Sequence, residues 1–195
     1  MSVTVAPVTG AGLVEVIPAL ARLRITVFRD FPYLYDGDAD YEASYLADFA
    51  AAEGAVIVVA RDGGTIVGAA TAAPLATQDK AWQAPLAAAG HAIDRIFYFG
   101  ESVLLASHRG LGIGHAFFDH REAQARAHGA AYAAFCSVIR ADDHPARPAG
   151  YRPLDAFWRA RGYAPLAGVT AAFDWRCVGE ADESRHILQY WSRAL

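Results

Sequence analysis

Three alternate glycines between an apolar run and a helical pattern constrain the fold of this chain more than any other feature. The run RIFYFGESVLL (95–105) is typical of a buried strand, and the stretch 113–128 has the spacing of a helix. Gly110, Gly112 and Gly114 lie between them. Because glycine is costly to order and a simple turn needs only one or two, three of them suggest that something approaches the backbone closely.

A helix that begins directly after such a turn is suited to bind an anion. Its first turn leaves backbone N–H groups without partners, and the helix dipole adds about half a positive charge there. Glycines let a phosphate approach without Cβ atoms in the way, and Arg109 adds a permanent cation with a fork of donors. The local chemistry therefore predicts a diphosphate over residues 109–115. The alternative is that the glycines only make a tight strand-to-helix connection.

Two common phosphate-binding patterns are not matched here. The dinucleotide fingerprint G-x-G-x-x-G would need glycine at position 115, where the chain has His115. The phosphate-loop pattern G-x-x-x-x-G-K-[ST] does not occur in the sequence. The second mismatch argues against ordinary ATP or GTP hydrolysis.

The order of apolar patterns predicts one mixed α+β domain over residues 1–195, with a strand–helix–strand segment (95–139) at its centre. Residues 76–93 fit a loop or a short helix. Helices are expected near 13–28, 40–52, 113–128 and 154–162, and strands at 3–8, 95–105, 130–139, 168–178 and 185–194, with a hairpin over 55–71 around Asp62-Gly63-Gly64.

Composition narrows the classes of partner. A formal net charge of −4 argues against a basic face for nucleic acid. No apolar run reaches the roughly 20 residues that a membrane helix needs, and no signal peptide is evident, so the expected location is cytoplasmic. Cys136 and Cys177 have no metal or redox spacing, and His115 and His120 do not share a helix face, so no metal is expected. Aromatic residues such as Trp191, taken as exposed, suggest a homodimer.

The glycine turn carries a resemblance to a known family. Residues 109–114, RGLGIG, match R/Q-x-x-G-x-G/A between an apolar strand and an amphipathic helix. This resembles the acyl-CoA signature of the GNAT superfamily of N-acyltransferases. The segment from Phe157 to Tyr163 resembles the penultimate helix of that fold, so the resemblance covers most of the chain. It implies a GNAT-like fold, a central mixed sheet with splayed parallel strands, here 95–105 and 131–139, flanked by helices.

The resemblance also implies a cosubstrate, acetyl-CoA, and an acceptor, a small-molecule or peptide amine. The thioester would lie between the splayed strands, and the main chain near Val103 and Leu104 would hydrogen-bond the pantetheine arm. The pyrophosphate would be held beside Arg109 by the backbone amides of Gly110, Leu111, Gly112, Ile113 and Gly114.

Glu101 is the leading candidate for the general base. Partial burial on its strand would raise the pKa of its carboxyl towards neutrality, although a solvated or ion-paired strand carboxylate fits the sequence equally well. Tyr98 and Ser102 are weaker candidates on the same strand. For a general acid the sequence departs from the family pattern, because Trp158 stands where many members have tyrosine; Tyr151 is the remaining candidate.

The acceptor pocket is expected at the segment that joins the first two helices. There Tyr33, Tyr35 and Asp36 would give aromatic walls and a carboxylate for a small cation. An aromatic-packed loop with solvated acids is the alternative. The functional prediction is an N-acetyltransferase that works by direct attack in a ternary complex. The alternatives are a non-catalytic acyl-CoA-binding module and a phosphate-anchored enzyme that uses another nucleotide.

Overall fold

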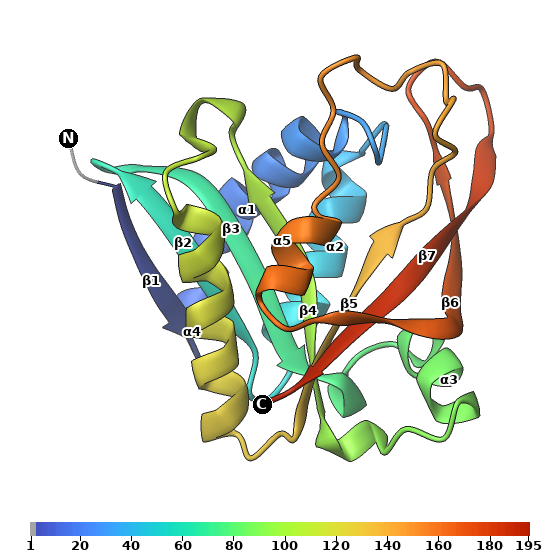
Figure 1. The fold of residues 1–195 in the computed structure, drawn as a ribbon. Helices are drawn as coiled ribbons and strands as arrows, with labels where there is room; N and C mark the ends of the chain where they lie inside the picture. The colour runs from blue at the N-terminus through green and yellow to red at the C-terminus, as the bar shows by residue number, and fades with distance from the viewer. Residues whose placement is uncertain (1–2) are drawn as a thin grey trace.

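Seven strands form one sheet in the order β1-β2-β3-β4-β5-β7-β6 (Figure 1). The computed structural model describes residues 3–195. The central neighbours β4 and β5 are parallel, and the other paired strands are antiparallel. The strands are β1 (Val3–Thr9), β2 (Val56–Asp62), β3 (Thr65–Pro74), β4 (Ile96–Leu104), β5 (Tyr132–Val138), β6 (Ala164–Arg176) and β7 (Glu183–Ala194). This mixed sheet with helices confirms the predicted α+β class.

Helices cover both faces of the sheet. Figure 1 shows α4 on one face of the sheet and α1 with α2 on the other. The N-terminus of α2 is capped by Asp38, whose carboxylate accepts from the N–H groups of Asp40 and Tyr41. The α-helices are α1 (Gly12–Phe28), α2 (Ala39–Ala50), α3 (Lys80–Ala88), α4 (Ile113–Ala127) and α5 (Asp155–Ala160), and short 3₁₀ turns occupy Leu75–Thr77, Ile93–Arg95 and Ala106–His108.

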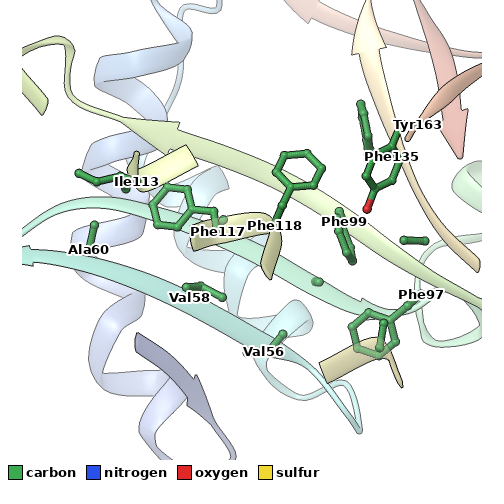
Figure 2. Close-up of a cluster of buried hydrophobic side chains, with 14 of the residues drawn as sticks. Val56, Val58, Ala60, Phe97, Phe99, Ile113, Phe117, Phe118, Phe135 and Tyr163 are labelled. Carbon is green, nitrogen blue, oxygen red and sulfur yellow. The ribbon is translucent and has the colours of Figure 1, made fainter. Parts of the chain in front are cut away.

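Burial on both faces explains why β2 is apolar from Val56 to Ala60. Val56 and Val58 pack under α4 in the cluster that Figure 2 shows, whereas Ile57 and Val59 pack under α1 and α2. Side chains alternate between the two faces of a strand, so a strand covered on both sides needs apolar residues at every position. The cluster under α4 also holds a group of aromatic rings: Phe97, Phe99, Phe117, Phe118, Phe135 and Tyr163.

The parallel strands β4 and β5 separate part-way along their length, as the splayed arrangement predicted. They pair from Ile96↔Tyr132 to Tyr98↔Ala134, and β4 then continues to Leu104 without β5 beside it. A register irregularity in the β3–β4 ladder lies just beyond the point of separation, where the pairing steps from Ala72↔Phe99 to Ala70↔Ser102. Gly100 and Glu101 are therefore presented at the point where the sheet opens.

Thr71 of β3 lies at this register irregularity and contacts β4. Its hydroxyl accepts a hydrogen bond from the Glu101 N–H at 3.1 Å. A Cβ atom added to Gly100 would lie 2.5 Å from the Thr71 hydroxyl oxygen, so the close approach requires glycine. The backbone at Gly100 and Glu101 is thus held by a side chain from the neighbouring strand.

The C-terminal strands differ from the sequence prediction in two respects. Strand β6 begins at Ala164 rather than at 168, because an irregularity between Pro165 and Thr170, with Gly168 at φ +74°, interrupts the strand pattern. Trp191 is not exposed: it is 2% accessible, with its ring stacked parallel to that of Phe135 and its indole N–H donating to Ser137. The prediction that Trp191 is exposed was therefore wrong, and it no longer supports a dimer. A homodimer stays an untested prediction.

Candidate active site

The glycine turn has an open backbone surface at the start of α4. Gly112 is the N-cap residue of α4, and both it and Gly110 have φ +79°, a conformation that favours glycine. A Cβ atom at either position would meet nothing within 4 Å, whereas one at Gly114 would lie 3.7 Å from the ring of Phe157. Two of the three glycines thus have a backbone conformation that favours glycine, whereas a Cβ at Gly114 would make an ordinary contact with α5.

The backbone N–H groups of this turn lack backbone partners among residues 3–195. Within residues 3–195, the N–H groups from Gly110 to Gly114 donate to no backbone oxygen, whereas that of His115 donates to Gly112 O at 3.0 Å. These N–H groups lie at the positive end of the helix dipole. The arrangement is suited to an anionic group that approaches the turn from outside.

The register of β4 decides which of its backbone groups face the open side. The Leu105 N–H donates to Val67 O at 3.0 Å, and Ala69 lies opposite Val103. Backbone groups alternate in direction along an antiparallel strand, so those of Val103 face β3 and those of Leu104 face the opening. The side chain of Arg109 already reaches this edge, where its Nε donates to Leu104 O at 3.4 Å. The register favours Leu104 over Val103 for a contact with a ligand.

A cavity of about 720 Å³ lies on the α1–α2 side of this opening. Glu101 lines it together with the predicted acceptor residues Tyr33, Tyr35 and Asp36. Tyr151 is not part of the lining and packs edge-on against Phe31, with ring centroids 4.7 Å apart. Much of the remaining lining is aromatic and comes from five elements: Phe28, Tyr41, Tyr45, Trp82, Tyr98, Phe173 and Trp175.

One guanidinium joins two buried carboxylates beside the cavity. Arg24 of α1 donates to Oε2 of Glu101 at 2.6 Å and to Oε2 of Glu42. Glu101 is 6% accessible and Glu42 is fully buried. Oε1 of each has no hydrogen-bond partner among residues 3–195. The group therefore carries one excess negative charge and two buried oxygens that can still accept a hydrogen bond.

The pKa of Glu101 reflects this environment. Burial raises it above the ordinary value for a carboxyl group; Arg24 opposes the rise, and the nearby charge of Glu42 adds to it. For Arg24 itself, burial alone would lower the pKa, but Glu101 and Glu42 raise it, so the guanidinium stays charged. Glu101 is thus a carboxylate that binds a proton more readily than a solvated one.

Comparisons with known proteins decide the family. A sequence model of the Acetyltransferase (GNAT) family matches residues 20–150. The chain belongs to the GNAT family of acetyltransferases. No curated protein has a significantly matching sequence.

Solved structures with the same fold cover nearly the whole length of this GNAT chain. The ribosomal-protein-alanine N-acetyltransferase of Brucella melitensis has a TM-score of 0.62 at 15% identity, covering 98% of this chain and 99% of its own. The yncA structure from Salmonella typhimurium, solved with its cofactor acetyl-CoA, has a TM-score of 0.62 at 13% identity, covering 100% and 95%. An N-acetyltransferase from Staphylococcus aureus Mu50 has a TM-score of 0.59 at 14% identity, covering 100% and 99%. At these identities the likeness shows the fold.

Sequence reasoning missed two of the charged residues at this GNAT site. Arg24 follows Leu20 by four residues on the buried stripe of α1, and Glu42 precedes Leu46 by four on the buried stripe of α2. A charged residue on the apolar stripe of a helix must find a partner in the core. These two charged residues on buried stripes were the signal that the sequence offered. They indicate a buried ion pair but do not show which residues form it.

The segment between α1 and α2 is hydrogen-bonded to β6 and to the turn that follows it. Tyr35 forms an antiparallel bridge with Cys177, and the Asp36 N–H donates to Arg176 O at 3.0 Å. The indole N–H of Trp175 donates to Tyr33 O at 3.2 Å. The guanidinium of Arg140, which follows β5, donates to the same carbonyl at 2.8 Å. These bonds give the cavity a fixed wall on this side.

A second buried arginine supports the backbone at Glu101 from the α4 side. Arg121 of α4 is 2% accessible and donates to Thr71 O and to Glu101 O, both at 3.3 Å. Its guanidinium also lies over the rings of Phe99 and Phe118. Burial lowers the pKa of Arg121 to about 10, so it is charged at neutral pH. It satisfies the carbonyls that the irregularity between β3 and β4 leaves available.

None of the helices in residues 3–195 is both long and apolar enough to cross a membrane.

Proposed function

We propose that this GNAT protein transfers an acetyl group from acetyl-CoA to a primary amine, by direct attack in a ternary complex with Glu101 as the general base. One observation carries the proposal. At the opening between β4 and β5, Arg109 of the glycine turn contacts Leu104 O, and the cavity beside the opening is lined by Glu101, a buried carboxylate with one oxygen that has no partner among residues 3–195. A donor held at the turn and an amine held in the cavity would meet at this opening.

The coenzyme would be held mainly by backbone groups. The N–H groups from Gly110 to Gly114, which include those of Leu111 and Ile113, would bind its pyrophosphate, with Arg109 beside them. This assignment is supported by their lack of backbone partners and by the open space over Gly110 and Gly112. The Leu104 backbone, which faces the opening, would hydrogen-bond the pantetheine arm in the manner of an added strand.

Glu101 would prepare the acceptor for attack. An amine enters as an ammonium ion, and Oε1 of Glu101 accepts its proton, directly or through a water molecule. When bound, acetyl-CoA would supply an activated thioester, at which the C–N bond of the amide forms as the C–S bond breaks, while the second proton of the nitrogen passes to the departing thiolate or to water. Because burial raises the pKa of Glu101, this carboxylate is a stronger base than a solvated one.

The proposal assigns no dedicated general acid. Tyr98 lines the cavity, but burial raises its pKa well above the ordinary value, which makes it a weak proton donor. Tyr151 lies outside the lining. A thiol has an ordinary pKa of about 8.5, so a thiolate can leave without prior protonation.

The test joins ligand binding and turnover. We expect coenzyme A, at about 100 times its dissociation constant, to stabilise the fold by about 2.7 kcal/mol, which raises the melting temperature. We expect release of thiol from acetyl-CoA when a primary amine is added. Thermal stabilisation without turnover on any amine would contradict the catalytic role, and no stabilisation would contradict the coenzyme site.

A matched pair of variants isolates the pyrophosphate contact. Asn and Asp have nearly the same shape, and both tolerate a positive φ better than other side chains. We expect Gly112→Asn to weaken coenzyme A binding and Gly112→Asp to weaken it at least about tenfold further, because like charges repel. Equal coenzyme A affinity in the two variants would contradict the placement of the pyrophosphate at Gly112.

A further inference from the structure

We propose that the acceptor amine carries a flat aromatic ring, which the cavity holds between aromatic side chains while the ammonium group points to Glu101. This inference rests on the proposed function and names the class of its substrate. It is carried by the shape and lining of the cavity together with the unpartnered oxygen of Glu101.

A first group of aromatic side chains comes from three separate elements. The ring of Trp82 on α3 lies 4.0 Å from that of Phe173 on β6 and 5.2 Å from that of Tyr98 on β4. All three line the cavity. The rings of Trp82 and Phe173 are only partly buried, so they keep apolar surface within it.

A second group follows from the segment after α1. The ring of Tyr33 lies 4.5 Å from that of Phe28 and 6.1 Å from that of Trp175. Trp175 is two residues from Phe173, so both project from the same face of β6 and join the two groups. The second group also lines the cavity and is partly buried. Partly exposed rings that share one concave site are the surface that a flat apolar ligand would cover.

The charges at the cavity favour a cation at its inner end. Glu101 and Glu42 share the single guanidinium of Arg24, which leaves one excess negative charge. Glu101 is 6% accessible and its Oε1 has no partner among residues 3–195. A buried carboxylate oxygen without a donor is costly, and an ammonium group supplies the missing hydrogen bond. The reacting nitrogen would thus be placed beside the proposed base.

Five acids line the cavity near its rim, and three of them, Asp36, Asp38 and Asp174, are bonded to protein groups. Asp36 pairs with Arg29 and Arg176, and Asp174 makes two hydrogen bonds with Arg185. Asp182 and Glu183, in contrast, are exposed and form no ion pair with residues 3–195. An aliphatic diamine is therefore the alternative that the experiment has to exclude.

The fixed wall favours a small acceptor over a protein chain. Tyr35 and Asp36 are bonded to Cys177 and Arg176 as an added strand would be, and two side chains bind Tyr33 O. A polypeptide acceptor needs an open groove for its following residues. A cavity of about 720 Å³ lies within the usual range for a small-molecule site.

The experiment compares four acceptors by thiol release from acetyl-CoA: 2-phenylethylamine, 2-cyclohexylethylamine, 1,5-diaminopentane and a short peptide with an alanine N-terminus. The first two have the same chain length and differ in the aromaticity of the ring. Because a favourable aromatic pair is worth about three- to tenfold beyond apolar contact, we expect kcat/KM for 2-phenylethylamine to exceed that for 2-cyclohexylethylamine by about that factor. We expect lower values still for the diamine and the peptide.

Two variants test whether the named rings cause this preference. We expect Trp82→Leu and Phe173→Leu each to bring the kcat/KM ratio of the phenyl to the cyclohexyl amine close to unity. Tyr132→Leu is the control, because Tyr132 is an exposed aromatic outside the cavity, and we expect it to keep the wild-type ratio.

The outcomes separate the two proposals. Equal or higher kcat/KM for the cyclohexyl amine, the diamine or the peptide would overturn the aromatic acceptor and leave the acetyltransferase proposal intact. An unchanged ratio in both cavity variants would overturn it as well. Coenzyme binding without turnover of any of the four amines would overturn both.

Discussion

Two buried glutamates on opposite faces of the sheet have contrasting surroundings. On the α4 side, Glu122 accepts from the Tyr163 hydroxyl at 3.0 Å, from Arg161 at 3.3 Å and from Arg193 at 3.4 Å, with Arg126 3.7 Å away. On the α1–α2 side, Glu101 and Glu42 share the guanidinium of Arg24, and each has an oxygen without a partner in the described chain, residues 3–195.

The difference distinguishes a structural carboxylate from the carboxylate that we propose as the base. Around Glu122, three arginines and the Tyr163 hydroxyl surround the carboxylate, so it has little capacity left for a ligand. Around Glu101 the anions outnumber the cation, and burial raises its pKa. Excess negative charge and an acceptor atom without a partner among residues 3–195 suit the cationic substrate that we propose. Substitutions at the two sites should therefore affect different properties of the protein.

The largest effect is expected on stability, from Glu122→Gln. The amide keeps the shape but removes the charge that Arg161 and Arg193 share, whose side chains are 11% and 26% exposed, and among residues 3–195 it leaves Arg161 only its ion pair with Asp119 at 2.6 Å. Loss of one partner from a buried ion pair costs about 3 kcal/mol of unfolding free energy, measurable by urea denaturation. We expect kcat/KM of the folded protein to stay at the wild-type value. If Glu122→Gln were as stable as wild type, Glu122 would have no structural role.

The opposite result is expected from Glu101→Gln, the matched substitution. Removal of a general base lowers kcat by about a hundredfold, which acetylation rates would show. Because the folded-state pKa of Glu101 is raised, its ionised form costs stability above that pKa, so the variant should be at least as stable as wild type at neutral pH. As pH falls through that raised pKa, the free energy of unfolding of the wild type rises relative to that of the variant. Wild-type rates in Glu101→Gln between pH 6 and 9 would exclude Glu101 as the base.

A smaller effect is expected from Arg24→Lys. A lysine keeps the charge but cannot hold two carboxylates with a planar fork. Because Arg24 lowers the pKa of Glu101, weakening this contact should move the acid limb of the pH–rate profile to higher pH, by about one unit. The control is Arg22→Lys, an exposed position on the same helix. An unchanged pH–rate profile in Arg24→Lys would show that Arg24 does not set the pKa of Glu101.

The smallest effect is expected at Arg126, the outermost cation near Glu122. Its side chain is 49% exposed and lies 3.7 Å from the carboxylate, four residues along α4. Such helix-surface pairs contribute about 0.2–0.5 kcal/mol. Arg126→Ala should therefore change the denaturation midpoint very little, whereas a loss comparable to that of Glu122→Gln would mean that the cations around Glu122 act as one unit.

The sequence by itself determined the features that depend on neighbouring residues. The hairpin at Asp62-Gly63-Gly64, the helices with regular apolar stripes and the strand–turn–helix around Gly110 and Gly112 all follow from local backbone preferences. The coenzyme side of the site could be proposed from the sequence for that reason. A turn whose glycines have positive φ, followed directly by a helix, forms its anion-binding surface from consecutive backbone groups.

Only the tertiary structure decided the acceptor side. Arg24 lies 77 residues from Glu101 in the sequence, and the cavity draws its rings from α1, α2, α3, β4 and β6. Thr71 sets the backbone at Glu101 from a neighbouring strand, and burial of Trp191 depends on Phe135 and Ser137 of β5. Periodicity shows which face of an element is buried, but not which element covers it. The charge balance and the shape of the cavity arise only when distant segments pack together.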